Sequence, residues 1–241
     1  MSSEQTSGFE ASREGPRLSR TPESTADARM QILATEHWSL LATRSLTYTE
    51  SFSRVSMFLA VLSGAVIALA LIAQAERFGT TFVLFAFLML SVVIFVGVAT
   101  IARLLGLNRD DMRWVIGMNR LRHAYVELHP DLEPYFVTGR YDDLRGVLLT
   151  LGVDSIPKRS RLSLVHGLQT LPGMLSVIVS VVAGGLAALF VVAVFASPEA
   201  GLIGAVAGFL ISLAALGFWQ MRSIRYTTVV APRFAGPEGV A

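Results

Sequence analysis

Four long stretches of the chain carry no charged residue, and they cover residues 55–75, 80–102, 167–198 and 200–221. An α-helix needs about 20 apolar residues to cross the hydrocarbon core of a bilayer, so each stretch is long enough for one crossing. In lipid the backbone must satisfy its own hydrogen bonds, which favours helices over irregular chain. The pattern predicts an all-α membrane protein with four transmembrane helices arranged as two hairpins.

The third stretch is longer than a simple crossing requires. Leu171-Pro172-Gly173 lies near its start. Because proline and glycine interrupt helices, we expect a break there and a span over 174–196.

Basic residues are distributed unevenly between the segments that connect the spans. Residues 1–54 carry six arginines, the first link carries only Arg77, the central segment carries ten basic residues, the second link carries none and the last 20 residues carry three. Basic residues near the ends of spans remain on the cytoplasmic side. The distribution therefore predicts a protein of the cytoplasmic (inner) membrane with both termini and the central segment in the cytoplasm.

The polar segments divide the remaining chain. Residues 27–54 place Met30, Leu33, His37, Leu40 and Leu41 at helical spacing, which predicts a cytoplasmic amphipathic helix. The expected organisation is a disordered tail at 1–26, this helix at 27–54, a first transmembrane hairpin at 55–102, a small helical cytoplasmic insert at 103–166, a second hairpin at 167–221 and a disordered tail at 222–241.

The insert itself shows two helical patterns. The first starts at Asn108, a suitable N-cap followed by Asp110 and Asp111, and it stops before Pro130. The second covers 141–151. Both aspartate pairs, Asp110-Asp111 and Asp142-Asp143, are then explained by helix starts, where the helix dipole favours anions.

Composition agrees with a membrane location. The chain of 241 residues is 53% hydrophobic and 16% charged, with a mean hydropathy of +0.56. It has no cysteine, which excludes disulfides, thiolate metal sites and a cysteine nucleophile. Lys158, Arg159 and Arg161 form a short basic group suited to lipid headgroups, and no aromatic platform accompanies it for nucleic acid. The bilayer is therefore the expected partner, with no nucleic acid.

One cluster in the insert has residue types that could bind a metal, and its members are His123, Glu127, His129, Asp131 and Glu133. His123 and Glu127 share a helix face, but the spacing is not that of a zinc-binding HExxH motif, and Pro130 leaves His129 at the helix end. A solvated helix terminus with a His–Glu pair explains the cluster better. We expect no metal, no cofactor and no catalytic residue.

Small residues recur at four-residue spacing in three of the spans, which allows helices to approach closely. They are Ala60, Gly64 and Ala68 in the first span, Ser180, Gly184 and Ala188 in the third, and Gly204 and Gly208 in the fourth. A four-helix bundle is the default setting for such contacts, and packing between subunits of a homo-oligomer is the alternative.

Two stretches, ATEHWSLLATRSLTYTESFSR at 34–54 and MNRLRHAYVELHPDLEPYF at 118–136, resemble uncharacterised multi-pass integral membrane proteins of actinobacteria. The resemblance covers the first hairpin and the insert, and it implies no activity.

The spans contain no Asp, Glu, Lys, Arg or His, whereas ion-coupled transporters place such groups at membrane depth. We therefore expect a non-enzymatic, self-associating structural or accessory component of the membrane. Two alternatives remain open: a homo-oligomeric channel or pore with a cytoplasmic vestibule, and a membrane-embedded enzyme.

Overall fold

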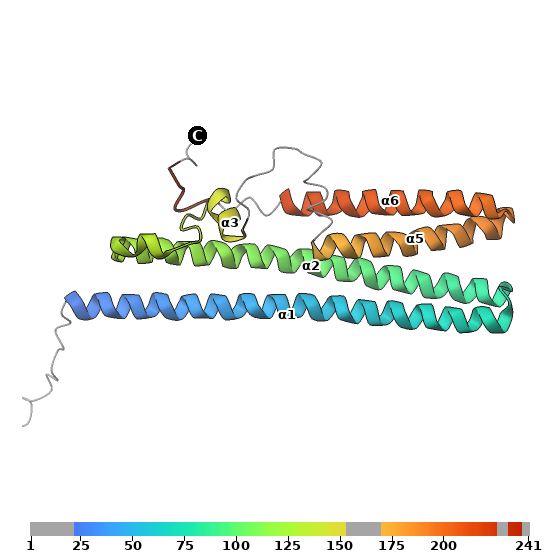
Figure 1. Ribbon diagram of the computed structural model, residues 1–241, viewed down its shortest axis with the longest axis horizontal. Coiled ribbons are helices and arrows are strands. Elements are labelled where there is room, and N and C mark those ends of the chain that lie inside the picture. The colour runs from blue at the N-terminus through green and yellow to red at the C-terminus, as the bar shows by residue number, and fades with distance from the viewer. Residues whose placement is uncertain (1–21, 153–169, 226–230, 238–241) are drawn as a thin grey trace, which may run out of the picture.

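The computed structural model describes residues 22–152, 170–225 and 231–237 (Figure 1). Within these ranges the chain is helical without any strand. Its elements are α1 (Pro22–Glu76), α2 (Thr80–Leu128), the 3₁₀ turn η1 (Pro130–Tyr135), α3 (Leu144–Thr150), α5 (Leu171–Phe195) and α6 (Pro198–Arg225). The expected basic group Lys158, Arg159 and Arg161 lies outside the described residues, as do residues 1–21.

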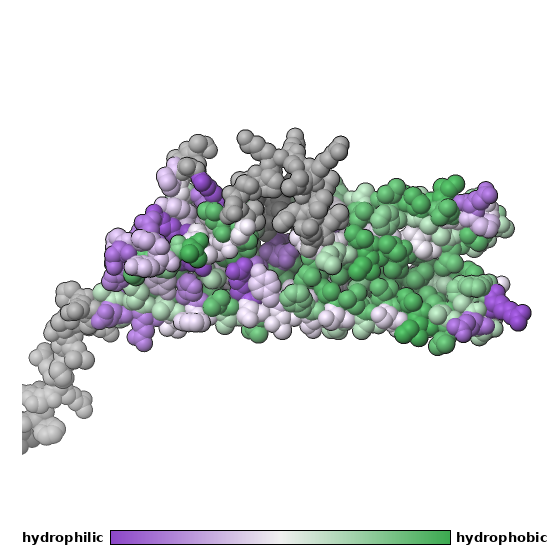
Figure 2. All heavy atoms as spheres, viewed as in Figure 1, coloured by the Kyte–Doolittle hydropathy of each residue, from purple (hydrophilic) through white to green (hydrophobic). Residues whose placement is uncertain are grey.

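Four helices, α1, α2, α5 and α6, are long and apolar enough to cross a membrane. Hydrophobic side chains cover the part of the surface where these four helices run together, and hydrophilic side chains gather at the opposite end and at the hairpin turns (Figure 2). The prediction of an all-α, multi-pass membrane protein is confirmed.

α1 and α2 are much longer than their spans, with 55 and 49 residues. α1 begins at Pro22, inside the segment 1–26 that was expected to be disordered, and it joins the amphipathic segment to the first span without a break. α2 likewise continues through Asn108, so the expected N-cap there is wrong. No proline lies within α2, and the helix packs along α1. It ends at Leu128, shortly before Pro130.

The two hairpin turns use left-handed backbone conformations. Arg77 and Phe78 have φ of 47° and 62°, and Ala196 has φ of 49°. At the start of α5 the Thr170 hydroxyl accepts the N–H of Gly173 at 3.2 Å, and Pro172 occupies the first turn. The expected break at Leu171-Pro172-Gly173 is therefore the beginning of the helix, because proline is tolerated where the N–H has no partner in the helix.

The long helices form an open row in the order α1, α2, α5, α6 (Figure 1). α1 packs extensively only along α2, and α5 packs on α2 and α6. The four helices therefore do not close into a ring, because α1 does not pack extensively along α6.

Gly97 of α2 is where three helices meet. A Cβ atom at this position would lie 2.4 Å from a methyl carbon of Val179 on α5 and 3.0 Å from the ring of Phe58 on α1. Both of these side chains are almost completely buried. The missing side chain thus allows α1 and α5 to approach α2 at the same level.

The expected small residues fall in two different settings. Gly184, Gly204 and Gly208 lie in the seam between α5 and α6, where a Cβ would come within 2.7 Å of the facing helix. Ser180 is buried in the same region, and the Ala188 carbonyl faces Gly201. In α1, by contrast, Ala60 and Gly64 are exposed and Ala68 is half-buried.

We predict that Gly97→Val destabilises the protein by about 1–3 kcal/mol, because the added methyl groups overpack the contact with Phe58 and Val179. The free energy of unfolding in detergent micelles measures this. Gly64→Val is the matched control, since a Cβ at Gly64 would meet nothing within 4 Å. Equal effects of the two substitutions would contradict the role of Gly97.

Candidate functional site: the polar head

The polar end of the molecule is built from the parts of α1 and α2 that extend beyond the spans, together with η1, α3 and residues 231–237 (Figure 1). We call this region the head and define its helical arms as 22–54 of α1 and 103–128 of α2. At about 1.5 Å per residue, the α1 arm reaches about 50 Å beyond the first span.

An ion pair joins the two arms near their middle. Arg44 donates from Nε to Asp111 Oδ1 at 2.7 Å and from Nη2 to Oδ2 at 3.4 Å, and the Tyr48 hydroxyl lies against the same carboxylate. Burial alone would lower the pKa of Arg44, but the hydrogen bond and charge of Asp111 more than offset it and raise the pKa. Asp110 and Asp111 therefore do not start a helix, as the sequence suggested; they lie in the middle of α2.

A second ionic contact lies closer to the spans. Glu50 of α1 accepts hydrogen bonds from Arg103 of α2 at 2.9 Å and from Arg54 of its own helix at 2.8 Å. Arg103, followed by Arg54, lowers the pKa of Glu50 to about 2. The carboxylate is therefore ionised across the physiological range. Its pair with Arg103 joins the two arms just outside the apolar part of the helices, while Arg54 contacts Glu50 from the same helix.

Asn119 is a completely buried polar residue of the head, with no exposed surface. Its Nδ2 donates to the Tyr141 carbonyl at 2.8 Å, and its Oδ1 accepts from Arg122 and from the Thr150 hydroxyl, each at 2.8 Å. The amide thus fixes α3 and the chain before it onto α2. The sequence did not single out Asn119, because an asparagine in the middle of a helix gives no pattern by itself.

His37, which the sequence placed on the apolar stripe of α1, lies on the side of that helix facing α2. Its ring stacks with Tyr125 at a centroid distance of 5.9 Å. Burial first, and then the charge of Arg122, lower the pKa of His37. Burial likewise lowers the pKa of Arg122, with a further contribution from Arg44. His37 is therefore held neutral and acts as a packing residue in this seam.

The residues considered for metal binding separate in the structure. His123 and Glu127 are 3.4 Å apart, whereas Glu133 pairs with Arg140 at 2.7 Å and His129 is the cap between α2 and η1. Among the described residues, no group of three or more His, Asp or Glu side chains converges as a metal site. The ring of His123 instead lies against two aromatic rings, those of Tyr141 at 5.9 Å and of Phe234 at 4.3 Å between centroids. Phe234 comes from near the C-terminal end of the sequence.

Asp142 and Asp143 each accept hydrogen bonds from two parts of the chain. Asp143 caps α3 by accepting the N–H of Gly146 at 2.7 Å, as expected for a helix start. Asp142 is buried, and it accepts Arg120 Nε at 2.8 Å and the backbone N–H groups of Arg233 and Phe234. Residues 231–237, which lie within the segment 222–241 that is expected to be disordered, are therefore attached to the head by hydrogen bonds.

The protonation of Asp142 is coupled to this attachment. Burial alone would raise its pKa, but the N–H groups of Arg233 and Phe234, with Arg120, more than offset burial and lower the pKa. A lowered pKa means that the attachment contributes stability above the ordinary pKa of the carboxyl and loses it as the pH falls through the lowered value.

Polar contacts also occur between α5 and α6. Gln220 donates to the Ser176 hydroxyl at 2.6 Å, and Ser180 and Ser212 are 3.3 Å apart. Ser176 in turn donates to the Pro172 carbonyl of its own helix. These polar groups form hydrogen bonds between α5 and α6, and such bonds help to join helices in lipid.

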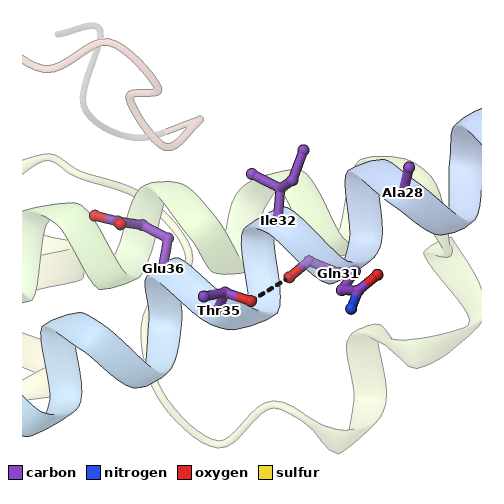
Figure 3. A pocket seen from close by; sticks show the side chains of 5 residues that line it. All are labelled: Ala28, Gln31, Ile32, Thr35 and Glu36. Atoms are coloured by element: carbon purple, nitrogen blue, oxygen red, sulfur yellow. Dashed lines mark hydrogen bonds between the residues drawn. The ribbon is translucent and has the colours of Figure 1, made fainter.

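A shallow hollow on α1 is lined by residues of this helix alone (Figure 3): Ala28, Gln31, Ile32, Thr35 and Glu36. The Thr35 hydroxyl already donates to the Gln31 carbonyl at 2.8 Å. No second element of the described part of the chain forms a wall, so this hollow is an exposed helix face.

We predict that Asp111→Asn destabilises the protein by about 1–3 kcal/mol, because it removes the charge from a partly buried, hydrogen-bonded pair. Asp110→Asn is the neighbouring control. Its partner Arg113 is 70% exposed, so the loss should stay below about 1 kcal/mol. The free energy of unfolding measures both, and a larger effect at Asp110 would contradict the role of the Arg44–Asp111 pair.

No protein-family model, curated protein or solved structure matches this chain. Its function is therefore inferred from the geometry described above.

Proposed function

We propose that the chain is a self-associating membrane protein with a structural or accessory role, and that copies associate through the outer face of the α1 arm. The observation that carries this proposal is an aromatic and apolar stripe on α1, outside the spans. It consists of Trp38, Leu41, Tyr48 and Phe52, all of which are exposed. We call these residues the outer stripe.

The spacing of the outer stripe is that of a helix–helix contact. With Ser45 between Leu41 and Tyr48, the positions advance by alternating steps of three and four residues. This is the a/d pattern with which one helix packs against another in coiled coils. The neighbouring pattern on α1, which includes His37 and Arg44, contacts α2. Tyr48 lies at the border between the two patterns, because its hydroxyl reaches Asp111 of α2 while much of its side chain stays exposed. Among the described residues, the rest of the outer stripe remains uncovered.

The membrane does not account for the whole outer stripe. Trp38 is 71% exposed. At about 1.5 Å per residue it lies about 24 Å along the helix from Arg54, where the apolar part of α1 begins. This distance places it beyond the headgroup region, in water, where an exposed large aromatic side chain is unfavourable. Burial against a second copy of the same helix removes that surface from water.

We further propose that the head lies in the cytoplasm and that the protein resides in the cytoplasmic membrane. Support comes from the arginines that surround the head side of the spans, while the two tight links carry only Arg77 between them. Both links lie at the end of the molecule opposite the head (Figure 1). Basic residues are retained in the cytoplasm during insertion.

The orientation is testable because the chain contains no cysteine. We expect Glu199→Cys, in the first turn of α6 next to the link, to react with a membrane-impermeant maleimide in intact cells. Val137→Cys, in the head, should react only after the cells are opened, although its side chain is 97% exposed. Labelling of Val137→Cys in intact cells would refute the proposed orientation.

Self-association is tested by placing charges on the outer stripe. The double variant Trp38→Glu/Leu41→Glu should shift the protein in nanodiscs or mild detergent to a smaller assembly, because two carboxylates in the contact must be desolvated. Light scattering coupled to size-exclusion chromatography measures the mass of the assembly.

Leu46→Glu is the matched control for this experiment. Leu46 is 69% exposed on the same arm but lies off the outer stripe, so this variant should keep the mass of the unsubstituted protein. A monomeric unsubstituted chain, or an equal loss of mass in both variants, would contradict association through the outer stripe.

A further inference from the structure

Residues 231–237 lie on the head in a way that resembles a bound peptide. Arg233 N donates to Asp142 Oδ2 at 2.9 Å, and Phe234 N donates to Asp142 Oδ1 at 2.8 Å. Asp142 N returns a hydrogen bond to the Phe234 carbonyl at 3.2 Å. One residue of the head therefore holds the backbone of two consecutive residues through both its side chain and its main chain.

The next carboxylate extends this contact. Asp143 Oδ2 accepts the N–H of Gly236 at 2.9 Å, while its Oδ1 caps α3 through Gly146 N. Since Asp143 is fixed as a helix cap, its second oxygen is held ready for a donor from outside α3. Backbone N–H groups are suitable donors, and hydrogen bonds to a charged acceptor are stronger than those between neutral groups.

Two side-chain features make the site selective. The ring of Phe234 stacks on His123 with a centroid distance of 4.3 Å and an interplanar angle of 26°. Gly236 is buried, and a Cβ there would lie 3.1 Å from the Tyr141 ring and 3.3 Å from Asp143 Oδ2. The site thus favours an aromatic residue followed two positions later by a residue without a side chain.

The electrostatics of the site require an occupant. The side chain of Asp142 has no exposed surface, and Arg120 is the cation that pairs with it at 2.8 Å. If residues 231–237 departed, both oxygens of this buried carboxylate would lose a backbone donor. Leaving a buried acceptor unsatisfied is costly, so the site favours a donor segment in place.

We propose that His123, Tyr141, Asp142 and Asp143 form a peptide-binding site that takes a segment with an aromatic residue followed two positions later by glycine. Residues 231–237 occupy it within the same chain. The segment is joined to α6 through five residues, 226–230, so its effective concentration at the site is of millimolar order. Free peptide therefore binds measurably only when the chain's own segment is displaced.

The test keeps the full chain and weakens its own segment with the double substitution Phe234→Ala/Gly236→Val. Fluorescence anisotropy then follows the binding of a labelled peptide APRFAGP, which has the sequence of residues 231–237. We expect saturable binding to this variant and binding at least about tenfold weaker to the unsubstituted chain, whose own segment competes. Asp142→Asn added to the variant should weaken peptide binding about tenfold.

The control peptide carries valine in place of its glycine and should not bind. Equal binding of the two peptides, or no saturable binding of APRFAGP at millimolar concentration, overturns the proposal.

Hydrogen exchange of the unsubstituted protein provides a readout that does not depend on the folding of the double variant. The amides of Arg233, Phe234 and Gly236 should be protected, and Asp142→Asn should release the first two while Gly236 stays protected through Asp143. Unprotected exchange of all three amides in the unsubstituted chain would also overturn the proposal. Neither experiment depends on self-association or on membrane orientation, so this site and the proposed function can fail separately.

Discussion

The close approach of three helices at Gly97 is the contact on which the arrangement of the membrane region depends. α2 packs extensively against α1 on one side and against α5 on the other, so it joins the two hairpins. Phe58 and Val179 converge on the backbone of Gly97 from these two helices. In lipid, where apolar surface alone does not drive helices together, such close backbone contact supplies the packing. The row is open because α1 has its contact with α2 and no comparable seam with α6.

One face of α1 contacts α2 both in the membrane region and in the head, but the residues on that face differ between these two parts. Ala65, Phe58, Ser51, Arg44 and His37 follow one another at intervals of seven residues, and the structure places them on the side of α1 that faces α2. In the membrane region the residues at these positions are apolar, and in the head they are polar or charged. A seven-residue repeat keeps one face of a helix toward its partner. The two arms are thus a continuation of the first hairpin into water, with ionic pairs replacing part of the apolar contact.

This continuity explains what could and could not be predicted from the sequence. The spans and the hairpins follow from hydropathy alone, because a crossing of lipid requires a long uncharged stretch. The contact between α1 and α2 in the head cannot be predicted from hydropathy, because Arg44 and Asp111 have the sequence pattern of surface charges. Their pairing follows only from the position of the partner helix. Asn108 has the preferences of a helix cap, but packing along α1 outweighs that local preference. Residues 231–237 contain two prolines and a glycine, so the segment itself shows no helical or strand pattern, and the two carboxylates that bind it lie about 90 residues away in the sequence. Gln220 and Gly97 were missed for the same reason: their partners lie on other helices.

The two surfaces proposed for the head lie on different sides of α2. Gly117 faces α1, since a Cβ there would lie 3.0 Å from Leu40. Asn119, two residues later and so about 200° further around the helix, faces the other way and binds Tyr141 and Thr150. The segment 231–237 is attached on the Asn119 side, through Asp142 and Asp143 (Figure 1). The outer stripe belongs to α1 on the other side. Association of copies through α1 therefore leaves the peptide site open to its own segment, and exchange of that segment does not require the α1 contact to separate.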